Sequence, residues 1–470
     1  MADETACPIR LPVPAQPKGN ALTMPNLIPY CILLAALPLT AQITLSDAVR
    51  RAGATYPGVQ APLEEVKAAA AGVQLARTQF LPKGEFLAQV NRATRNNVYG
   101  MLLPQSTLPA ISGPPLAANA GTSVWGTATG FLISWEPFDF GLRDARVRAA
   151  EAGQARSEAA AARRRFDVET ATADAFLTVL AAQRTVEAAQ AGLERARQVE
   201  KVVAALAQAG LRPGADLARA QSERALAEAQ LIQAEQSVRA AQATLRQFAG
   251  ETAVVPGPLL KEPPVAAMAA AAAHPLLREQ QASAAEVEAR HKSLDLAWRP
   301  RFLTQSALYA RGTGANPDFT TGGAVSGLGP NIYNWGVGFT VLFPFLDFPQ
   351  IKSQKDAESS RLAAEQARAR TIERELAAAT ERAQSQADAA RRIARLVPEQ
   401  VSAARAAFAQ AQARYQSGLA PVVELADAQR LLTLAESDST LAQLNVWRGL
   451  LAVAVAQGDL APFLELAGRP

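Results

Sequence analysis

The sequence predicts a mainly α-helical protein with a membrane β-barrel, in which a long coiled-coil barrel of helices is continuous with the strands. Three observations support this fold class. The chain contains an internal tandem duplication, each half contains one exceptionally long helical run, and each half contains short segments in which apolar and small polar residues alternate. Apolar residues at steps of three and four indicate helices, and a period of two indicates strands.

The composition excludes several classes of protein. Of the 470 residues, 49% are hydrophobic but only 6% are aromatic, because alanine supplies most of the apolar count. Alanine-rich helices pack closely but do not fill wide globular cores. A mean hydropathy of -0.00 with 19% charged residues argues against a polytopic helical membrane protein and against wholesale disorder. The net charge of +4 is nearly balanced, so we expect no nucleic-acid partner.

Residues 1–41 are expected to be an N-terminal extension and signal peptide. The apolar run from Cys31 to Leu39 is too short to span a bilayer but suits a signal peptide, with cleavage after Ala41. A buried N-terminal helix is the alternative interpretation, although three prolines in this region disfavour it. The two cysteines, Cys7 and Cys31, both precede the cleavage site, so the mature chain would have no disulfide and no thiolate metal site.

The mature chain consists of two sequence repeats that align with each other. Gly210, Leu211, Pro213 and Leu217 align with Gly418, Leu419, Pro421 and Leu425 at one constant offset, and Tyr56-Pro57 and Pro82 align with His274-Pro275 and Pro300 at a slightly larger one. We therefore expect a first repeat at 42–253, a Pro-rich linker at 254–264, a second repeat at 265–460 and a C-terminal tail at 461–470.

Each half has the same order of elements. An Ala-rich helical stretch (46–80 and 274–297) ends at a proline and is followed by two alternating segments around a Gly/Pro/Asn-rich loop. A very long helix follows (141–209 and 350–417), and after a Gly-Leu-x-Pro turn comes a helix of about half that length (216–248 and 424–457). At ~1.5 Å per residue, each long helix would extend about 100 Å, far beyond a globular core.

The alternating segments have the length and pattern of membrane strands. Large apolar residues share one face and glycine, alanine or small polar residues the other; those we expect to face lipid are Trp125, Phe131, Trp135, Tyr333, Trp335, Phe339 and Phe343. Their partners, 86–95 and 302–311, alternate less clearly. The alternative is a half-buried strand of a soluble sheet. Four strands cannot enclose a lumen, and open sheet edges are not tolerated in hydrocarbon, so a barrel would have to close across subunits.

The chain resembles the outer-membrane efflux protein family, the TolC-like channel-tunnels of Gram-negative bacteria. The resemblance rests on the strand-to-helix passages WGTATGFLISWEPFDFG and WGVGFTVLFPFLDF and on the paired turns GLRPGADLARAQ and GLAPVVELADAQ. It implies a homotrimer with a 12-stranded barrel in the lipid of the outer membrane and a large periplasmic helical part.

The same resemblance implies a function. The chain would be the passive exit duct of a tripartite efflux or type I secretion system, conducting drugs, other small molecules or polypeptides, with a periplasmic adaptor and an inner-membrane pump as partners. The alternative is a structural coiled-coil protein of the cell envelope that transports nothing.

No catalytic arrangement is present in the sequence, and we expect neither an enzyme nor a cofactor. His274 and His291 are the only histidines, and His274 precedes a proline at a helix start, where a capping or packing role is expected rather than a metal site.

Two sites follow from the resemblance. Acids after the second turn, Glu424 and Asp427, would surround the periplasmic entrance, with Tyr415 holding it closed and Asp216 matching Glu424 in the first repeat. Ala420 stands where the family pattern has an arginine, and Arg219 replaces the second acid in the first repeat. The alternative for the acids is simple stabilisation of a helix N-terminus.

The turns themselves are the second expected site. The adaptor would dock on Gly210, Leu211 and Pro213 and on Gly418, Leu419 and Pro421, where an exposed leucine offers an apolar contact. Ordinary turn chemistry, with glycine ending one helix and proline starting the next, is the alternative.

Overall fold

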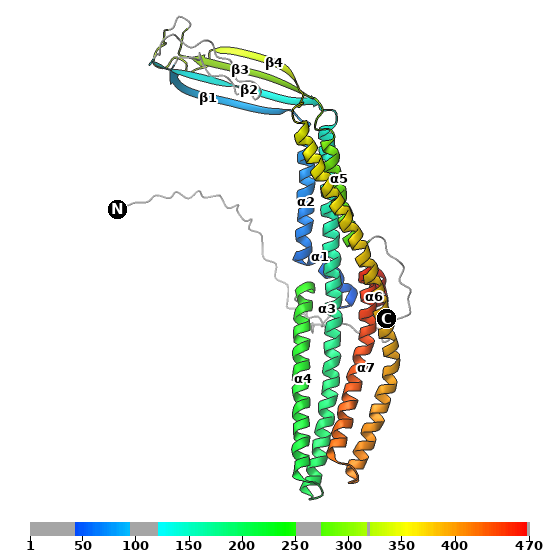
Figure 1. Cartoon of the computed structure of the whole chain (residues 1–470). Helices are drawn as coiled ribbons and strands as arrows, with labels where there is room; N and C mark the ends of the chain where they lie inside the picture. Colours follow the sequence, from blue (N-terminus) through cyan, green and yellow to red (C-terminus); the bar gives the residue numbers. More distant parts are fainter. Residues whose placement is uncertain (1–42, 95–120, 251–273, 317–319, 468–470) are drawn as a thin grey trace, which may run out of the picture. The chain divides into compact units, whose positions relative to one another are not determined.

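The computed structural model describes residues 43–94, 121–250, 274–316 and 320–467 (Figure 1). The predicted signal peptide and the linker at 254–264 lie outside the described residues. The elements are α1 (Leu45–Thr55), α2 (Pro57–Thr78), β1 (Lys83–Thr94), β2 (Ser123–Phe138), α3 (Leu142–Gln208), α4 (Gly214–Ala249), α5 (Pro275–Leu294), β3 (Arg301–Thr313), β4 (Ile332–Leu342), α6 (Phe348–Gln416), α7 (Val422–Gln457) and α8 (Ala461–Ala467).

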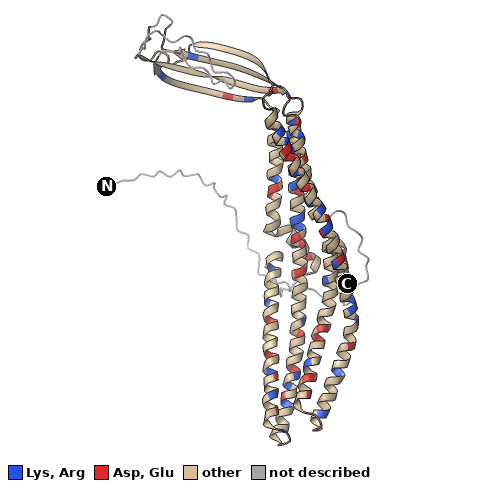
Figure 2. Cartoon of the chain, viewed as in Figure 1, with Lys and Arg blue, Asp and Glu red and all other residues tan. Residues whose placement is uncertain are grey.

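The order of elements predicted for both halves is confirmed. Helices α3 and α6 have 67 and 69 residues, and α6 runs through Pro398 without interruption. Helix α3 packs against α4 and α6 against α7, so each half forms one long helical hairpin beyond the strands. None of the described helices has both the length and the apolar character needed to cross a bilayer. Charges of both signs are spread along the helices, whereas the strands carry few (Figure 2).

Two shorter helices stack along each long one. In the first half the ring of Tyr56, just before α2, lies 5.3 Å from the ring of Phe248 near the end of α4. In the second half His274, just before α5, contacts the Val455 carbonyl near the end of α7 through Nε2 at 3.1 Å. Tyr56 and His274 are equivalent residues of the two repeats. Each repeat therefore has the same contact between the two stacked shorter helices, made by a different side chain.

The expected capping role of His274 is confirmed. Its Nδ1 accepts a hydrogen bond from the Leu276 N–H at 3.1 Å, which satisfies one of the free donors at the start of α5. Because Nδ1 accepts, Nε2 carries the proton that is donated to Val455.

The first Ala-rich stretch differs from the prediction. It is not one helix over 46–80, because it breaks at Tyr56 into α1 and α2. Tyr56 precedes Pro57, which disfavours the helical conformation at Tyr56, and its backbone is extended (φ -66°, ψ 127°). The sequence also did not indicate α8, whose Phe463 is fully buried.

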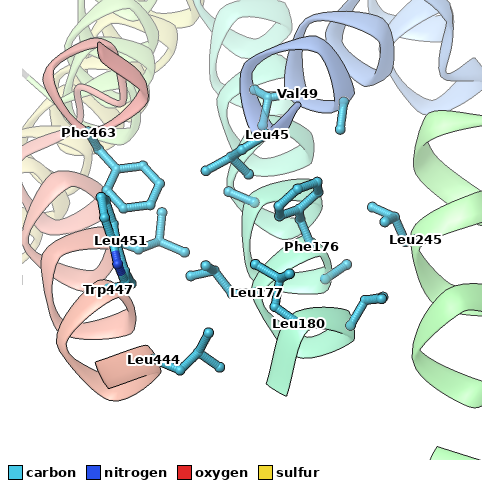
Figure 3. Packing of buried hydrophobic residues seen from close by; sticks show 14 of the residues in the cluster. Leu45, Val49, Phe176, Leu177, Leu180, Leu245, Leu444, Trp447, Leu451 and Phe463 are labelled. Atoms are coloured by element: carbon cyan, nitrogen blue, oxygen red, sulfur yellow. The ribbon is translucent and has the colours of Figure 1, made fainter. Parts of the chain in front are cut away.

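The main apolar core lies where α1, α3, α4, α7 and α8 meet (Figure 3). Phe176 and Leu177 of α3 are buried there with Leu245 of α4 and with Trp447 of α7, whose ring lies 6.1 Å from that of Phe463. On α3, this core contains Phe166, Ala173, Leu177 and Leu180, which follow one another at intervals of seven, four and three residues, the spacing of one helix face.

Small residues allow the helices of a hairpin to approach closely. A Cβ added at Gly449 of α7 would lie 2.8 Å from the Cα of Ala387 in α6. Around this crossing the buried residues are Ala383, Ala387 and Val453. Larger side chains here would force α6 and α7 apart, as expected for an interior packed at crystal density.

The four strands form one antiparallel sheet in the order β1-β2-β3-β4. Its two faces differ as predicted. Phe131 and Phe86 pair on one face with their rings 5.0 Å apart, and Phe339 and Trp335 on the same face are 81% and 79% exposed. The opposite face carries all the charged strand residues except Arg92, namely Lys83, Glu85, Glu136, Arg301 and Arg311, together with Gln89, Ser134 and Gln305.

Because the two faces of the sheet differ, we expect a polar substitution to destabilise the protein at one position of β4 and to be tolerated at the neighbouring position. Replacing Phe339 with Arg should destabilise the membrane-inserted protein by ~2–4 kcal/mol, because the charge would face hydrocarbon. Replacing Gly338 with Ser should be mild, because an added Cβ meets no atom within 4 Å on the polar face. Denaturant unfolding of both variants in lipid vesicles tests this, and equal destabilisation at the two positions would show that the apolar face does not contact lipid.

Candidate functional site: the strand–helix junction and the helix turns

The predicted lipid-facing residues lie on one face of the sheet, with one exception. Phe131, Trp135, Tyr333, Trp335 and Phe339 are exposed there. Trp125 shares the face but is half-buried, and the guanidinium of Arg92 lies over its ring at 5.3 Å. Phe343 was predicted as a strand residue, but β4 ends at Leu342, immediately before the Phe343-Pro344 step that disrupts further pairing.

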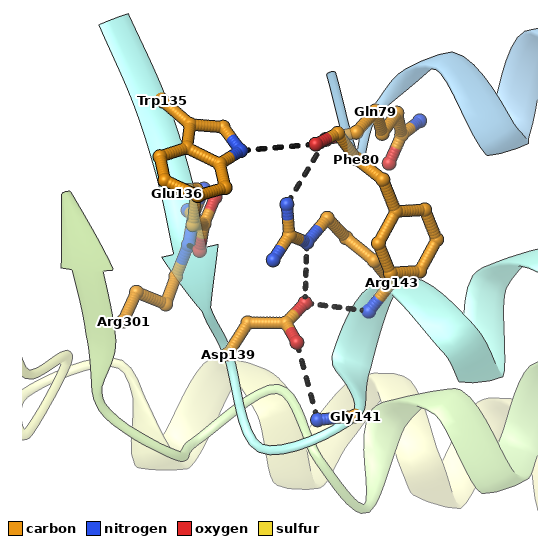
Figure 4. Close-up of polar contacts among 8 residues, drawn as sticks. All are labelled: Gln79, Phe80, Trp135, Glu136, Asp139, Gly141, Arg143 and Arg301. Atoms are coloured by element: carbon orange, nitrogen blue, oxygen red, sulfur yellow. Dashed lines mark hydrogen bonds and ion pairs between the residues drawn. The ribbon is translucent and has the colours of Figure 1, made fainter. Parts of the chain in front are cut away.

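A buried ion pair fixes the passage from β2 into α3 (Figure 4). Arg143 Nε donates to Asp139 Oδ2 at 3.0 Å, and the two side chains are only 6% and 7% exposed. The Arg143 backbone N–H also donates to Oδ2 at 2.7 Å, and Gly141 donates to Oδ1 at 3.1 Å. Burial alone would raise the pKa of Asp139, but these bonds outweigh it and lower the pKa below its usual value.

The same passage is tied to its neighbours. Arg143 Nη1 donates to the Gln79 carbonyl at 3.1 Å, and Trp135 Nε1 donates to the Phe80 carbonyl at 3.0 Å (Figure 4). Glu136 receives two bonds from Arg301 of β3, at 2.7 and 2.8 Å. The end of α2, the base of β2 and β3 and the start of α3 are therefore held as one unit.

The two predicted turns have the expected geometry. Gly210 and Gly418 adopt φ of +71° and +80°, a region that favours glycine. Leu211 N–H donates to the Leu206 carbonyl at 3.0 Å and Leu419 N–H to the Arg414 carbonyl at 2.8 Å, the pattern that ends a helix at a left-handed glycine. Pro213 and Pro421 then precede the first residues of α4 and α7.

The two turn leucines are left without a packing role. Leu211 and Leu419 are 70% and 73% exposed, among the largest exposed fractions of any described apolar side chain outside the strands.

Tyr415 lies beneath both turns. It is fully buried in an apolar cluster with Val199, Val203, Ala411, Val422 and Leu425. Its hydroxyl donates to Asp216 Oδ2 at 3.4 Å across the two hairpins. Burial and the Asp216 carboxylate raise the pKa of Tyr415 above its usual value, so the hydroxyl keeps its proton.

Arg212 completes this cluster and was not predicted. From the first turn its Nη2 donates to the carbonyls of Tyr415 at 2.8 Å and Ala420 at 3.1 Å, and its guanidinium lies 4.5 Å from the centre of the Tyr415 ring. Arg212 aligns with Ala420 in the repeat. The arginine that the second turn lacks is therefore present in the first turn and reaches across to the second, a signal that the repeat alignment contained.

The structure separates the predicted acids. Asp216 belongs to the Tyr415 cluster, whereas Glu424 lies 3.4 Å from Arg414 Nη1 and is partly exposed. Asp427 is exposed on the first turns of α7 and forms no ion pair with any other described residue. Among those residues no group of three or more His, Cys, Asp or Glu could hold a metal ion.

Solved structures share this fold. The outer-membrane channel OprN matches with a TM-score of 0.70 and 18% identity over 88% of this chain and 89% of that one. VceC from Vibrio cholerae matches with a TM-score of 0.70 and 15% identity over 88% and 96%. The open state of the MtrE outer membrane channel of Neisseria gonorrhoeae matches with a TM-score of 0.68 and 16% identity over 88% and 89%. Comparison with curated protein sequences finds no match.

The family model for outer membrane efflux proteins matches residues 48–251 and 268–459, which are nearly all of both predicted repeats. Members of this family are trimeric outer-membrane channels that work with adaptor and pump partners. The chain belongs to the outer membrane efflux protein family, as an outer-membrane channel with a large periplasmic part.

Proposed function

We propose that this chain forms a homotrimeric exit duct of a tripartite efflux or type I secretion system. The observation that carries the proposal is the sheet: one face is an exposed aromatic stripe, the other is polar, and only β2 and β3 have partners on both sides among the described strands. Three copies would pair β4 of one chain with β1 of the next and close a barrel of twelve strands, which leaves no open edge in lipid.

Fractionation and conductance test this proposal. We expect the mature chain in the outer-membrane fraction, extracted by detergent as a trimer, with ion-conducting channels after reconstitution in planar bilayers. Recovery as a soluble species without detergent would instead support the alternative of a structural envelope coiled coil. Chemical crosslinking in cells, followed by identification of the captured adaptor and pump, separates efflux from secretion.

We propose that the Tyr415 cluster holds the periplasmic entrance closed. Arg212 and Asp216 belong to the first hairpin, and Tyr415 and Ala420 to the second, so their hydrogen bonds join the two hairpins of one chain at the turn end. Glu424 and Asp427, repeated in each copy, would add a ring of acids there, which favours cations.

Replacing Arg212 with Ala should open the entrance. The variant loses two charge-assisted hydrogen bonds and the contact with the Tyr415 ring, which removes about 1.5–3 kcal/mol of closed-state stabilisation. Single-channel recordings should show a larger conductance, and Tyr415→Phe, which loses only the bond to Asp216, should show a smaller increase in the same direction. Arg219→Ala, which removes an exposed arginine from α4, the helix that follows the first turn, is the matched control. Equal conductance in all four proteins contradicts the gate.

We propose that the turns are the docking site of the adaptor. The exposed Leu211 and Leu419 stand at the ends of the two hairpins, each between a left-handed glycine and a proline that fix the shape of the turn. An apolar side chain presented by a rigid turn offers contact area to a partner at low entropic cost.

The double variant Leu211→Asp and Leu419→Asp should abolish efflux in cells while the trimer remains present at normal level and conducts normally in bilayers. Ala215→Asp adds the same charge at an exposed site beside the first turn and should leave efflux intact. Normal efflux by the leucine double variant would place docking elsewhere.

A further inference from the structure

A pocket of about 340 Å³ lies at the strand–helix junction, apart from the turns. Its lining combines the end of α2, the bases of β1, β2 and β3, and the first turns of α3. Five of the six strand residues in this lining, Lys83, Ser134, Glu136, Arg301 and Leu303, belong to the polar face of the sheet, opposite Phe131 and Phe339. The sixth, Trp135, belongs to the aromatic face and is held at the edge by its bond to the Phe80 carbonyl. In a closed barrel the polar face surrounds the lumen, so these five lining side chains would face the path of solutes.

The pocket has more positive than negative charge. Four of its lining residues are cations: Lys83, Arg143, Arg146 and Arg301. Arg143 is neutralised by Asp139, and Arg301 by Glu136. Lys83 and Arg146 are exposed and have no ion pair with any other described residue, so two positive charges per chain remain uncompensated at this height.

Two of the cations come from equivalent positions of the repeats. Lys83 and Arg301 each begin the first strand of their half, directly after Pro82 and Pro300, and they flank β2 from opposite sides. Arg301 uses Nε and Nη2 for Glu136, which leaves further N–H donors on a guanidinium that is 35% exposed.

The remaining lining residues distinguish the two halves. In the second repeat the positions of Glu136, Arg143 and Arg146 are held by Pro344, Ile351 and Gln354. The duplicated fold alone therefore does not produce the pocket. At these positions the first repeat has an ion pair that orients Arg301, a second ion pair that holds the start of α3, and an unpaired cation on α3, and the second repeat has none of the three side chains involved.

We propose that this pocket binds an oxyanion, such as the phosphate or carboxylate of a solute in the channel, through Lys83, Arg146 and Arg301. The inference rests on the proposed function, because it takes the polar face to be the lumen. Several cations that line one concave site attract such groups and can donate charge-assisted hydrogen bonds to them, and a pocket of this size accommodates a small organic anion. Three copies would form one ring of anion sites where the strands begin.

The test uses the purified trimer in planar bilayers of phosphatidylcholine, with inorganic phosphate as the probe. We expect phosphate to reduce the current of the unmodified channel. The double variant Lys83→Gln and Arg146→Gln should need on the order of tenfold more phosphate for the same reduction, and its reversal potential in a KCl gradient should shift toward cation selectivity. Lys352→Gln is the matched control, because Lys352 is exposed at the fifth residue of α6 as Arg146 is at the fifth residue of α3.

The outcomes are distinguishable. If the unmodified protein forms no channel, the proposed duct is wrong. If it conducts but phosphate and selectivity are the same in the double variant, the duct stands and the anion site is overturned. Addition of phosphatidylglycerol tests whether the pocket binds a lipid headgroup instead of a solute. If this lipid stabilises the unmodified trimer more than the double variant, and free phosphate has no effect on the current, the pocket binds a headgroup. The proposed luminal site is then overturned.

Discussion

The unpaired edges of β1 and β4 impose the constraint on which the rest of the molecule depends. In hydrocarbon an unsatisfied backbone donor or acceptor costs several kcal/mol, and a row of them along a strand cannot persist. The sheet therefore requires other copies of the chain, and the helices that continue from its strands are brought side by side by the same assembly. The exposed aromatic residues of the sheet, Trp335 and Phe339 among them, are covered neither within the chain nor by strand pairing, which fits a face that meets lipid.

Duplication explains the architecture, and divergence between the copies explains its chemistry. Tyr56 and His274 occupy one position and form the same joint by different means, ring packing in one case and a hydrogen bond in the other. Arg212 and Ala420 occupy a second equivalent position. Only the first repeat has a charged residue there, and the Arg212 side chain extends to the turn of the second repeat. In the first half, the buried ion pair of Arg143 with Asp139 holds the passage from strand to helix. In the second half, Ile351 stands at the position of Arg143. At these positions, where the two repeats have different residues, one repeat has a hydrogen bond or an ion pair in place of apolar packing.

Local pattern predicted the strands, the long helices and both turns, because period, proline and glycine act over a few residues. It did not predict the break at Tyr56, although Pro57 contained that signal, nor α8, whose burial depends on Trp447 of a neighbouring helix. Tyr415 was identified through family resemblance, but its partner Arg212 was not, because that contact crosses two hairpins separated by about half the chain. Asp216 was expected at the entrance only as the counterpart of Glu424, and its hydrogen bond with Tyr415 was not predicted. The ring of Glu424 and Asp427 stays a prediction.

The contacts between the two hairpins show where the molecule can move. Near the main core, α3, α4 and α7 share fully buried apolar residues such as Leu177, Leu245 and Leu450, and separating them would expose this surface to water. Toward the turns the hairpins meet through polar contacts instead: Arg195 of α3 with Glu436 of α7 at 2.8 Å, and Arg430 of α7 with Glu223 of α4 at 3.3 Å, beside a cavity of about 290 Å³. Water can replace the more exposed pair, Arg430 with Glu223, at little cost in free energy, whereas Arg195 and Glu436 are only 17% and 21% exposed and cost more to separate. In the proposed gate, the buried Tyr415 cluster is then an apolar contact that resists separation of the turns, and a few hydrogen bonds beneath the turns would act on the end of α3, a helix about 100 Å long.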